Sequence, residues 1–316
     1  MSRIEEALRR ANQVALEPAQ SGAGGQVEPL TTRVQGRVEM GAVVENRSEA
    51  EAAEAVSSVN VPVAPAATDG FGPATHSIEH VAENNNEKLI VSEVAQPTAV
   101  EQYRKLAAAL HQVQTARGTR IVMVASATVG EGKTLTSVNL ALTLSESFRR
   151  QVLLVDADLR RPTVHDLFQI SNASGLNDGL KADHDGKLAL IEVSPRLTVL
   201  PAGGPNQDPM SGLSSERMRR IIEEASARFE WVVLDTPPVG LLPDANLLAE
   251  MVDMIVLVIG AGSTPLHLVQ SAVKALNRDR IVGVVLNRVD ESQGAYQYYD
   301  YATTRRDRPN VAPMSA

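Results

Sequence analysis

The segment ATVGEGKT, which begins at Ala127, has the spacing of a loop that binds phosphate groups. The pattern for such a loop is G-x-x-x-x-G-K-[ST], and Ala127 takes the place of the first glycine. Gly130 and Gly132 allow backbone N–H groups to close around phosphate oxygens. Lys133 is expected to bridge the β- and γ-phosphates of a nucleotide, and Thr134 to bind Mg²⁺. A glycine-rich turn without a ligand is the alternative.

The residues around this loop favour a nucleotide-binding site. An apolar run, IVMVAS, precedes the loop, and a helical pattern, TLTSVNLALTLSESF, follows it. The N-terminus of a helix adds a partial positive charge that faces the bound anion. The residues expected to contact ATP are Gly130, Glu131, Gly132, Lys133, Thr134 and Leu135.

Three aspartates follow other apolar runs and could complete a magnesium site. VLLVDADLRRP places Asp156 and Asp158 at the carboxyl end of a predicted strand, and WVVLDTPP places Asp235 at the end of another. Ligands bind at this end of the strands in open α/β sheets, and a phosphate loop needs carboxylates to hold the metal. We expect Thr134, Asp158 and Asp235 to hold Mg²⁺, directly or through water. Each aspartate could instead cap the turn that follows it.

A fourth run, IVGVVLN, ends at Asn287. An asparagine at the end of a late strand could hydrogen-bond the adenine of the nucleotide. Asparagine is also common in turns, so a purely structural role stays open.

A sheet must position these residues, because nearly all of them follow apolar runs. The runs are rich in β-branched residues and almost continuously apolar, as in strands buried on both faces. Helical patterns lie between them, at 133–149, 214–228, 244–251 and 265–277. This alternation predicts an α/β fold with a doubly wound, mostly parallel sheet and helices on both faces, as in P-loop NTPases. The expected strands are 121–126, 152–156, 197–203, 231–235, 254–260 and 281–287.

The composition excludes several chemistries. The chain of 316 residues contains no cysteine, so disulfides, thiolate zinc sites and iron–sulfur clusters are excluded. The net charge of −8, without a stripe of lysine and arginine, argues against nucleic acid as the main partner. The longest apolar run, MIVLVIGAG, is far shorter than the roughly 18–20 residues that cross a bilayer, so no direct membrane span is expected.

The chain is expected to have four parts. Residues 1–16 have a helical pattern; such a helix could dock on the core or a partner, or lie on a membrane surface. Residues 17–87 read as a linker that is mostly disordered, because few large apolar side chains are present to bury. Residues 88–301 hold all the motifs described above, and 302–316 form a polar tail.

The order of the motifs ATVGEGKT, VLLVDADLRRP, LPAGGPNQDP, WVVLDTPP and GVVLNRV resembles that of the bacterial tyrosine kinases, the autokinases of exopolysaccharide and capsule loci. That family lies within the ParA/MinD-like P-loop ATPases. The resemblance covers residues 88–301, and its most specific part is D-x-D-x-R, matched by Asp156, Asp158 and Arg160. Thr128 replaces a lysine that the broader group carries early in the loop, which favours the kinase branch.

The resemblance implies a set of catalytic residues for phosphoryl transfer to tyrosine. Asp156 would accept the proton of the tyrosine hydroxyl, since a positioned carboxylate can take a proton late in a loose transition state. Arg160 would steady the phosphates or the incoming tyrosine. The implied catalytic residues are Lys133, Asp156, Asp158, Arg160 and Asp235.

The C-terminal segment AYQYYDYATTRR holds four of the five tyrosines of the chain. In the resembling family such a cluster is the autophosphorylation site, and a neighbouring subunit supplies the acceptor. An aromatic edge strand or a packed tail is the alternative. The implied acceptors are Tyr296, Tyr298, Tyr299 and Tyr301.

The same family carries an E-x-x-R-x-x-R pattern that builds a ring of subunits. EQYRKLAAAL supplies Glu101 and Arg104, but Ala107 replaces the last arginine. Glu101 and Arg104 lie three residues apart on one helix face, so they could contact another subunit or pair within the helix.

The resemblance therefore implies a non-specific protein-tyrosine autokinase that uses ATP and Mg²⁺ and regulates exopolysaccharide or capsule synthesis or export. Its implied partners are further copies of itself and a membrane-embedded polysaccharide co-polymerase or adaptor. That adaptor would recruit the cytoplasmic protein to the inner face of the cell membrane. A P-loop ATPase that acts as a positioning or regulatory switch without kinase activity is one alternative. A nucleotide-sensing module with negligible turnover is another.

Overall fold

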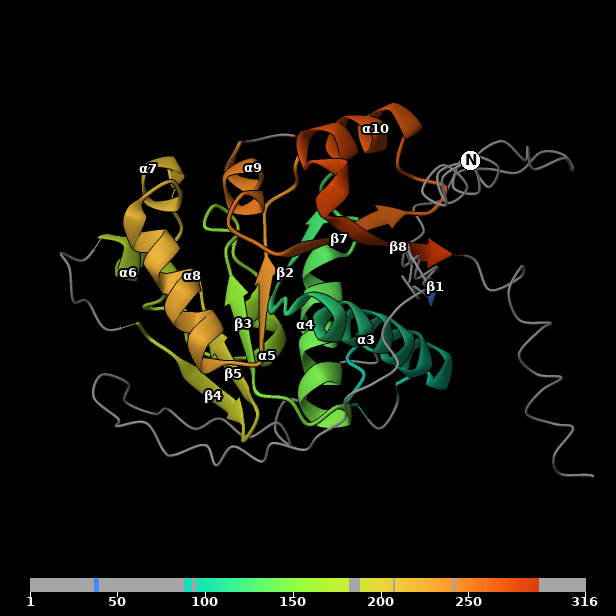
Figure 1. Cartoon of the computed structure of the whole chain (residues 1–316), viewed down its shortest axis with the longest axis horizontal. Helices are drawn as coiled ribbons and strands as arrows, with labels where there is room; N and C mark the ends of the chain where they lie inside the picture. Colours follow the sequence, from blue (N-terminus) through green and yellow to red (C-terminus); the bar gives the residue numbers. More distant parts are fainter. Residues whose placement is uncertain are drawn as a thin grey trace, which may run out of the picture.

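An eight-stranded sheet forms the centre of the described structure (Figure 1). The computed structural model describes residues 88–92, 95–181, 188–206, 208–240 and 243–289, together with the backbone of Arg37–Glu39. The strands follow the order β1-β8-β7-β2-β6-β3-β5-β4 across the sheet. They are β1 (Arg37–Glu39), β2 (Ile121–Ser126), β3 (Val152–Asp156), β4 (Ile191–Ser194), β5 (Leu197–Leu200), β6 (Trp231–Asp235), β7 (Met254–Gly260) and β8 (Ile281–Val289).

The strands from β8 to β5 are parallel, whereas β1 and β4 are antiparallel strands at the two edges. All six apolar runs of the sequence form these parallel strands, which confirms the doubly wound, mostly parallel sheet. The short strand β4 was not expected from the sequence. In β4, exposed Glu192 lies between buried Ile191 and Val193, as befits an edge strand rather than a buried one.

Helices cover both faces of the sheet. The helices α3, α4 and α5 pack on one face, and α6 to α10 pack on the other. They are α3 (Pro97–Arg117), α4 (Lys133–Leu142), α5 (Val164–Phe168), α6 (Leu176–Lys181), α7 (Met210–Leu213), α8 (Glu216–Arg228), α9 (Asp244–Ala249) and α10 (Leu266–Ala275), with a π-helical turn η1 (Thr143–Ser147) and a 3-10 turn η2 (Arg278–Arg280).

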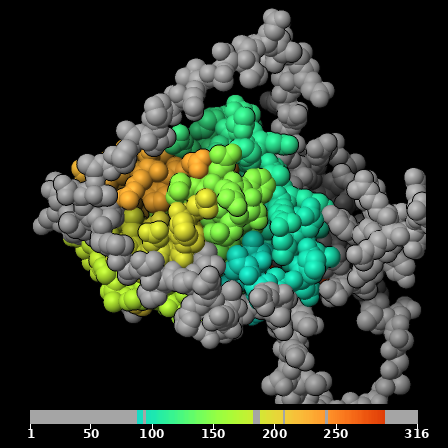
Figure 2. Space-filling view, turned by 90° about the horizontal axis from the view of Figure 1, so that it is seen from below, coloured from blue at the N-terminus to red at the C-terminus, as the bar shows by residue number. Residues whose placement is uncertain are grey.

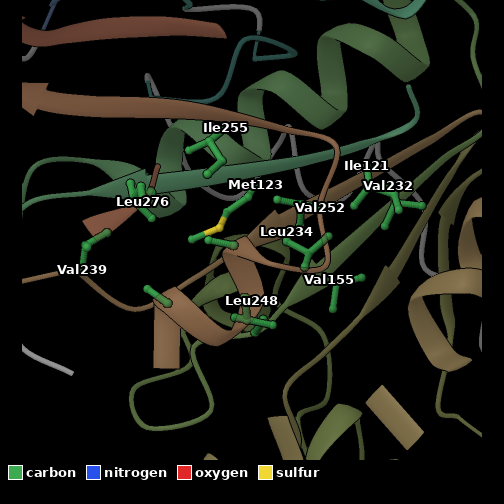
Figure 3. Close-up of a cluster of buried hydrophobic side chains, with 14 of the residues drawn as sticks. Ile121, Met123, Val155, Val232, Leu234, Val239, Leu248, Val252, Ile255 and Leu276 are labelled. Carbon is green, nitrogen blue, oxygen red and sulfur yellow. The ribbon is translucent and has the colours of Figure 1, made fainter. Parts of the chain in front are cut away.

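Alternate residues of the central strands belong to two separate apolar layers. In β2, Val122 and Val124 pack beneath α3 and α4, whereas Met123 and Ala125 belong to the opposite layer. Figure 3 shows Met123 in that second layer near Ile255 of the adjacent strand β7. Full burial of one such aliphatic side chain stabilises the fold by about 1.5–3 kcal/mol. The two layers therefore hold the ends of the strands in fixed positions.

The helix that follows the phosphate loop is shorter as an α-helix than the expected range 133–149. α4 ends at Leu142 and continues as the π-helical turn η1. There the Thr143 hydroxyl donates to the Asn139 carbonyl oxygen at 2.7 Å, and the Phe148 N–H donates to the Thr143 carbonyl oxygen at 3.1 Å. The latter bond spans five residues and widens the last turn.

Asn139 of α4 binds the backbone at the start of the domain, on both sides of Leu89. The Asn139 side chain donates to the carbonyl oxygen of Lys88 at 2.9 Å and accepts from the N–H of Ile90 at 3.1 Å. Leu89 between them is fully buried. α3 contacts η1. Figure 2, which views the molecule from below, shows the teal residues of α3 beside lime-green residues around η1. The start of the domain is thus tied to α4.

Some parts of the chain in the predicted organisation fall outside the described residues. These are the N-terminal helix expected at 1–16, most of the expected linker at 17–87 and the polar tail at 302–316. Within the linker range, the backbone of Arg37–Glu39 forms β1 against β8. Among the helices that the structure describes, none is long and apolar enough to cross a membrane.

Candidate active site

The loop between β2 and α4 is shaped by two glycines in the left-handed region. Gly130 has a φ of 83° and Gly132 a φ of 93°, and L-residues with side chains rarely adopt this backbone conformation. A Cβ on Gly132 would lie 1.9 Å from Nδ2 of Asn287. Gly132 is also the N-cap of α4. No side chain caps this end of the helix, so its partial positive charge faces the loop.

Lys133 begins α4 and points at the end of β6. Its Nζ lies 3.0 Å from Oδ1 of Asp235, which also accepts from the Ser137 hydroxyl at 3.0 Å. Nζ also lies 4.0 Å from Oδ2 of Asp158. Lys133 and Asp235 are both buried, so the ammonium partly neutralises the two carboxylates. The loop thus brings together Lys133, Asp158 and Asp235, as the sequence predicts.

The same residues fit a small hard cation. Oδ2 of Asp235 is buried and makes no hydrogen bond to any part of the chain that the structure describes. Nearby, the Thr134 hydroxyl lies 3.4 Å from Nζ of Lys133 and accepts from the Thr163 hydroxyl at 3.3 Å. The described chain has no cluster of three His, Cys, Asp or Glu side chains that could hold a metal. Mg²⁺ needs only one or two carboxylates when substrate phosphates and water complete its shell.

Asp156 differs from its expected role as a proton acceptor. It is fully buried, and Oδ2 accepts from the N–H groups of Thr163 and Val164 at 3.1 Å each. Oδ1 accepts from the N–H of Asp158 at 3.2 Å. Burial, with a smaller contribution from the charge of Asp235, raises the pKa of Asp156 to about 8. In this conformation Asp156 organises the loop between β3 and α5 and does not line the cavity.

Asp158 is more accessible than Asp156. Its Oδ1 accepts from the N–H of Arg161 at 3.1 Å, which turns the loop after β3. Burial raises the pKa of Asp158, and the charge of Lys133 opposes that effect. Asp158 lines the cavity, so a bound substrate could reach its carboxylate.

Arg160, the last residue of the D-x-D-x-R motif, is held by a residue that the sequence analysis missed. Its Nε and Nη2 donate to Oδ2 and Oδ1 of Asp244 at 2.6 Å and 3.2 Å. Asp244 is fully buried at the start of α9, and its hydrogen bond raises the pKa of Arg160. In the sequence, the only sign of Asp244 is that it is an acidic residue in the first turn of a predicted helix. Such a residue usually indicates only a favourable charge at the helix N-terminus.

The Glu131 side chain points into the protein instead of towards the phosphate loop's ligand side. Its Oε2 accepts from the N–H of Thr128 at 2.6 Å, and Oε1 accepts from the N–H of Gly260 at 3.3 Å and from the hydroxyl of Thr264. Glu131 is buried, so these bonds tie the loop to the end of β7. Only the backbone of Glu131 remains available for the expected contact with ATP.

Asn287 supports the loop from beneath and does not line the cavity. Its Nδ2 donates to the carbonyl oxygen of Glu131 at 2.8 Å, and its Oδ1 accepts from the N–H of Arg288 at 2.9 Å. The amide group that was expected to contact adenine is therefore used within the protein. The geometry favours the structural alternative for this residue.

A cavity of about 640 Å³ opens where the ends of β2, β3, β6 and β8 meet. That volume is within the usual range for small-molecule sites. The phosphate loop forms one side, and the loops after β3 and β6 form others. The lining residues are Ser126, Thr128, Val129, Gly130, Gly132, Lys133, Thr134, Leu135, Asp158, Arg160, Arg161, Thr163, Pro237, Pro238 and Arg288.

The remaining predicted residues lie away from this cavity or outside the description. Glu101 and Arg104 are partly exposed on α3 and pair within the helix, with 3.9 Å between Oε2 and Nη1. Ala107, at the position of the missing arginine, lies on the buried face of α3. The four C-terminal tyrosines lie beyond Val289, outside the described residues.

The fold and the loop together define a nucleotide-binding domain of the P-loop class. Consistent with this, residues 122–314 match the family described as the CobQ/CobB/MinD/ParA nucleotide binding domain. The tyrosine-protein kinase YwqD of Bacillus subtilis is 35% identical over 203 residues, which cover 63% of this chain and 85% of YwqD. The succinoglycan biosynthesis transport protein ExoP of Rhizobium meliloti is 30% identical over 69% of this chain, but over only 29% of ExoP.

A solved structure agrees with these sequence comparisons. The kinase domain of the Escherichia coli tyrosine kinase ETK is 32% identical, with a TM-score of 0.55, over 64% of this chain and 80% of that one. The chain therefore belongs to the bacterial tyrosine-protein kinases, a family of enzymes within the CobQ/CobB/MinD/ParA nucleotide-binding group.

Proposed function

We propose that this protein transfers the γ-phosphate of ATP to tyrosines in its own C-terminal cluster and so regulates the synthesis or export of an extracellular polysaccharide. The observation that carries the proposal is the convergence of Lys133, Asp158 and Asp235 at the phosphate loop, where Nζ of Lys133 lies 4.0 Å from Asp158 and 3.0 Å from Asp235. The names of YwqD and ETK support tyrosine as the acceptor, and that of ExoP supports the link to polysaccharide.

The phosphates of ATP would lie in the loop, against backbone N–H groups and the N-terminus of α4. Lys133 lies between the loop and the aspartates, so its ammonium can stabilise the negative charge that develops on the transferred phosphoryl group. Leu135 and the prolines of the loop after β6 give the cavity apolar walls. These walls exclude water from the transfer step.

Mg²⁺ would be held by Thr134 and Asp235, with Asp158 contacting it only through water. The unpartnered Oδ2 of Asp235 supports this assignment. When bound, the ion would screen the charge on the phosphate oxygens. Lys133, whose Nζ lies 3.0 Å from Oδ1 of Asp235, would remain beside the phosphates.

We assign acceptance of the tyrosine proton to Asp158 rather than to Asp156. Asp158 lines the cavity, whereas both oxygens of Asp156 accept backbone N–H groups. The raised pKa of Asp158 makes its carboxylate a stronger base than an exposed aspartate. Arg160, fixed by Asp244, would steady this loop during transfer.

The proposed acceptors are Tyr296, Tyr298, Tyr299 and Tyr301, supplied by a neighbouring copy of the chain. Each phosphotyrosine adds about −1.5 to −2 charges, so phosphorylation of several tyrosines would drive subunits apart. The exposed Glu101 and Arg104 are candidates for the contact between copies. We further propose a membrane-embedded adaptor that holds this protein at the inner face of the cell membrane.

The test measures phosphotyrosine on the purified chain after incubation with Mg-ATP, with and without a candidate adaptor. Wild type is expected to become labelled, and Lys133→Ala to remain unlabelled. Lys274→Ala, an exposed lysine on α10, is the control and should be labelled like wild type. Replacement of all four C-terminal tyrosines with phenylalanine should remove most of the label.

Each outcome decides one part of the proposal. ATP hydrolysis without any phosphotyrosine on wild type would overturn the kinase assignment and favour a nucleotide-dependent switch. Full labelling of the four-phenylalanine variant would place the acceptor elsewhere. Labelling of Lys133→Ala at the wild-type rate would contradict the assigned site.

A further inference from the structure

Arg288, near the end of β8, has an unusual backbone conformation beside the cavity. Its φ is 63°, in the left-handed region that side-chain-bearing residues seldom occupy. In the ladder with β1, Val38 pairs with Asn287 and Arg37 pairs with Val289, so Arg288 has no counterpart. This is a β-bulge, a feature that redirects a side chain and is frequent next to active sites.

The bulge directs the Arg288 side chain to the phosphate loop. Arg288 Nη2 lies 4.0 Å from the point where a Cβ on Gly130 would stand, and Arg288 lines the cavity. No carboxylate of the described residues lies within ion-pair distance of this guanidinium. Within the described part of the chain this cation therefore has no anionic partner, and it lies beside a loop shaped to bind anions.

One side chain fixes both the loop and the bulge. Asn287 donates to the carbonyl oxygen of Glu131 and accepts from the N–H of Arg288. The position of the Arg288 backbone relative to the loop is therefore set by the fold. Backbone strain of this kind persists where the surrounding structure enforces it.

Two of the cations at the site, Lys133 and Arg160, already lie beside carboxylates. Lys133 is the lysine of the loop, but Asp235 and Asp158 lie 3.0 Å and 4.0 Å from its ammonium. Arg160 is engaged by Asp244 in a two-point ion pair. The other two arginines that line the cavity, Arg161 and Arg288, have no ion-pair partner among the described residues, and Arg288 lies at the Gly130 side.

We propose that Arg288 is a nucleotide-binding residue whose guanidinium contacts the phosphates of the nucleotide in the loop. This inference rests on nucleotide binding, as the proposed function does, but it does not require kinase activity. Arg288 lies beyond the phosphate loop in sequence and reaches it only through the bulge. A planar guanidinium can bind phosphate oxygens through two parallel N–H groups held in one plane, a fixed geometry that a lysine lacks.

The test measures the affinities of the full chain for ATP, ADP and AMP by calorimetry. Arg288→Gln, which keeps part of the side chain and removes the charge, is expected to weaken ATP and ADP about tenfold or more, as for loss of a charged hydrogen bond. AMP should be affected less, because it lacks the β- and γ-phosphates. Arg288→Lys should restore part of the affinity. Arg278→Gln, an exposed arginine outside the cavity, is the control.

An unchanged affinity of Arg288→Gln for ATP would overturn the proposal. An equal loss for ATP, ADP and AMP would also overturn it, since that result indicates a contact with the base or ribose. Thermal unfolding of the nucleotide-free variants checks that the fold is intact. Wild type that binds ATP but makes no phosphotyrosine would contradict the kinase assignment alone, so the two proposals fail separately.

Discussion

Arg160 and Asp244 form a two-point ion pair between the loop that follows β3 and the first turn of α9. The Asp244 side chain is almost completely buried, whereas that of Arg160 keeps 24% of its surface exposed. The pair therefore fastens the loop after β3, which lines the cavity, to α9 through a carboxylate that water scarcely reaches. It also explains why an arginine follows the two aspartates of the D-x-D-x-R motif.

Loss of Arg160 should destabilise the domain. Arg160→Met leaves the buried Asp244 carboxylate without its partner, and removal of one member of a buried pair costs about 3–5 kcal/mol. We expect the lower end of that range, because the arginine is partly exposed. Urea unfolding of the nucleotide-free protein measures the effect. Arg161→Met, at the exposed neighbouring position, should change the unfolding free energy by less than about 0.5 kcal/mol; equal midpoints for the two variants would refute the pairing.

Gly132→Ala should disrupt the phosphate loop. The new Cβ would stand 1.9 Å from Nδ2 of Asn287, and the residue would be held at a φ of 93°. The left-handed backbone alone costs about 1–2 kcal/mol, and Asn287 must also move. Thermal unfolding and ATP affinity should both fall. Gly283→Ala in β8 is the matched control, because nothing lies within 4 Å of its added Cβ. A Gly132→Ala variant as stable as this control would contradict the geometry.

The stability of the nucleotide-free domain should fall as pH rises from about 4 to about 8. Unfolded Asp156 loses its proton near 3.8, but the folded residue keeps it to about 8, because burial disfavours the charge. The folded state thus binds more protons in this window, which makes the slope of unfolding free energy against pH negative. Melting temperature should drop by about 2–4 °C for each kcal/mol lost. Asp156→Asn should flatten this slope, and an unchanged slope in the variant would assign the effect to other groups.

Asn287→Asp should loosen the phosphate loop while it preserves the shape of the side chain. The carboxylate cannot donate to the carbonyl oxygen of Glu131, so a buried acceptor loses its partner at a cost of about 1–3 kcal/mol. We expect lower stability in urea and weaker ATP binding. Gln270→Glu, an amide-to-acid change on the exposed face of α10, should leave both unchanged. ATP affinity that survives Asn287→Asp intact would show that the loop does not need this support.

The sequence predicted the parallel strands and the phosphate loop because both depend on local order. Continuous apolar runs form strands wherever two helical layers bury them, and ATVGEGKT needs only a strand before it and a helix after it. The edge strand β4 escaped prediction, since a strand of four residues carries little periodic signal. The helix after the loop was predicted too long, because the widened turn at Thr143 depends on hydrogen bonds that its composition does not reveal.

By itself the sequence determined which residues could carry the chemistry: Lys133, Asp158 and Asp235 were all named from their motifs. Only the tertiary structure decided what each side chain faces. In the structure, Asp156 accepts from backbone N–H groups and Asn287 donates to the phosphate loop. Arg160 pairs with Asp244, and Arg288 lies beside Gly130. The physical reason is that a motif specifies residue types along one segment. The partners of buried polar groups come from other segments, at distances that only packing sets.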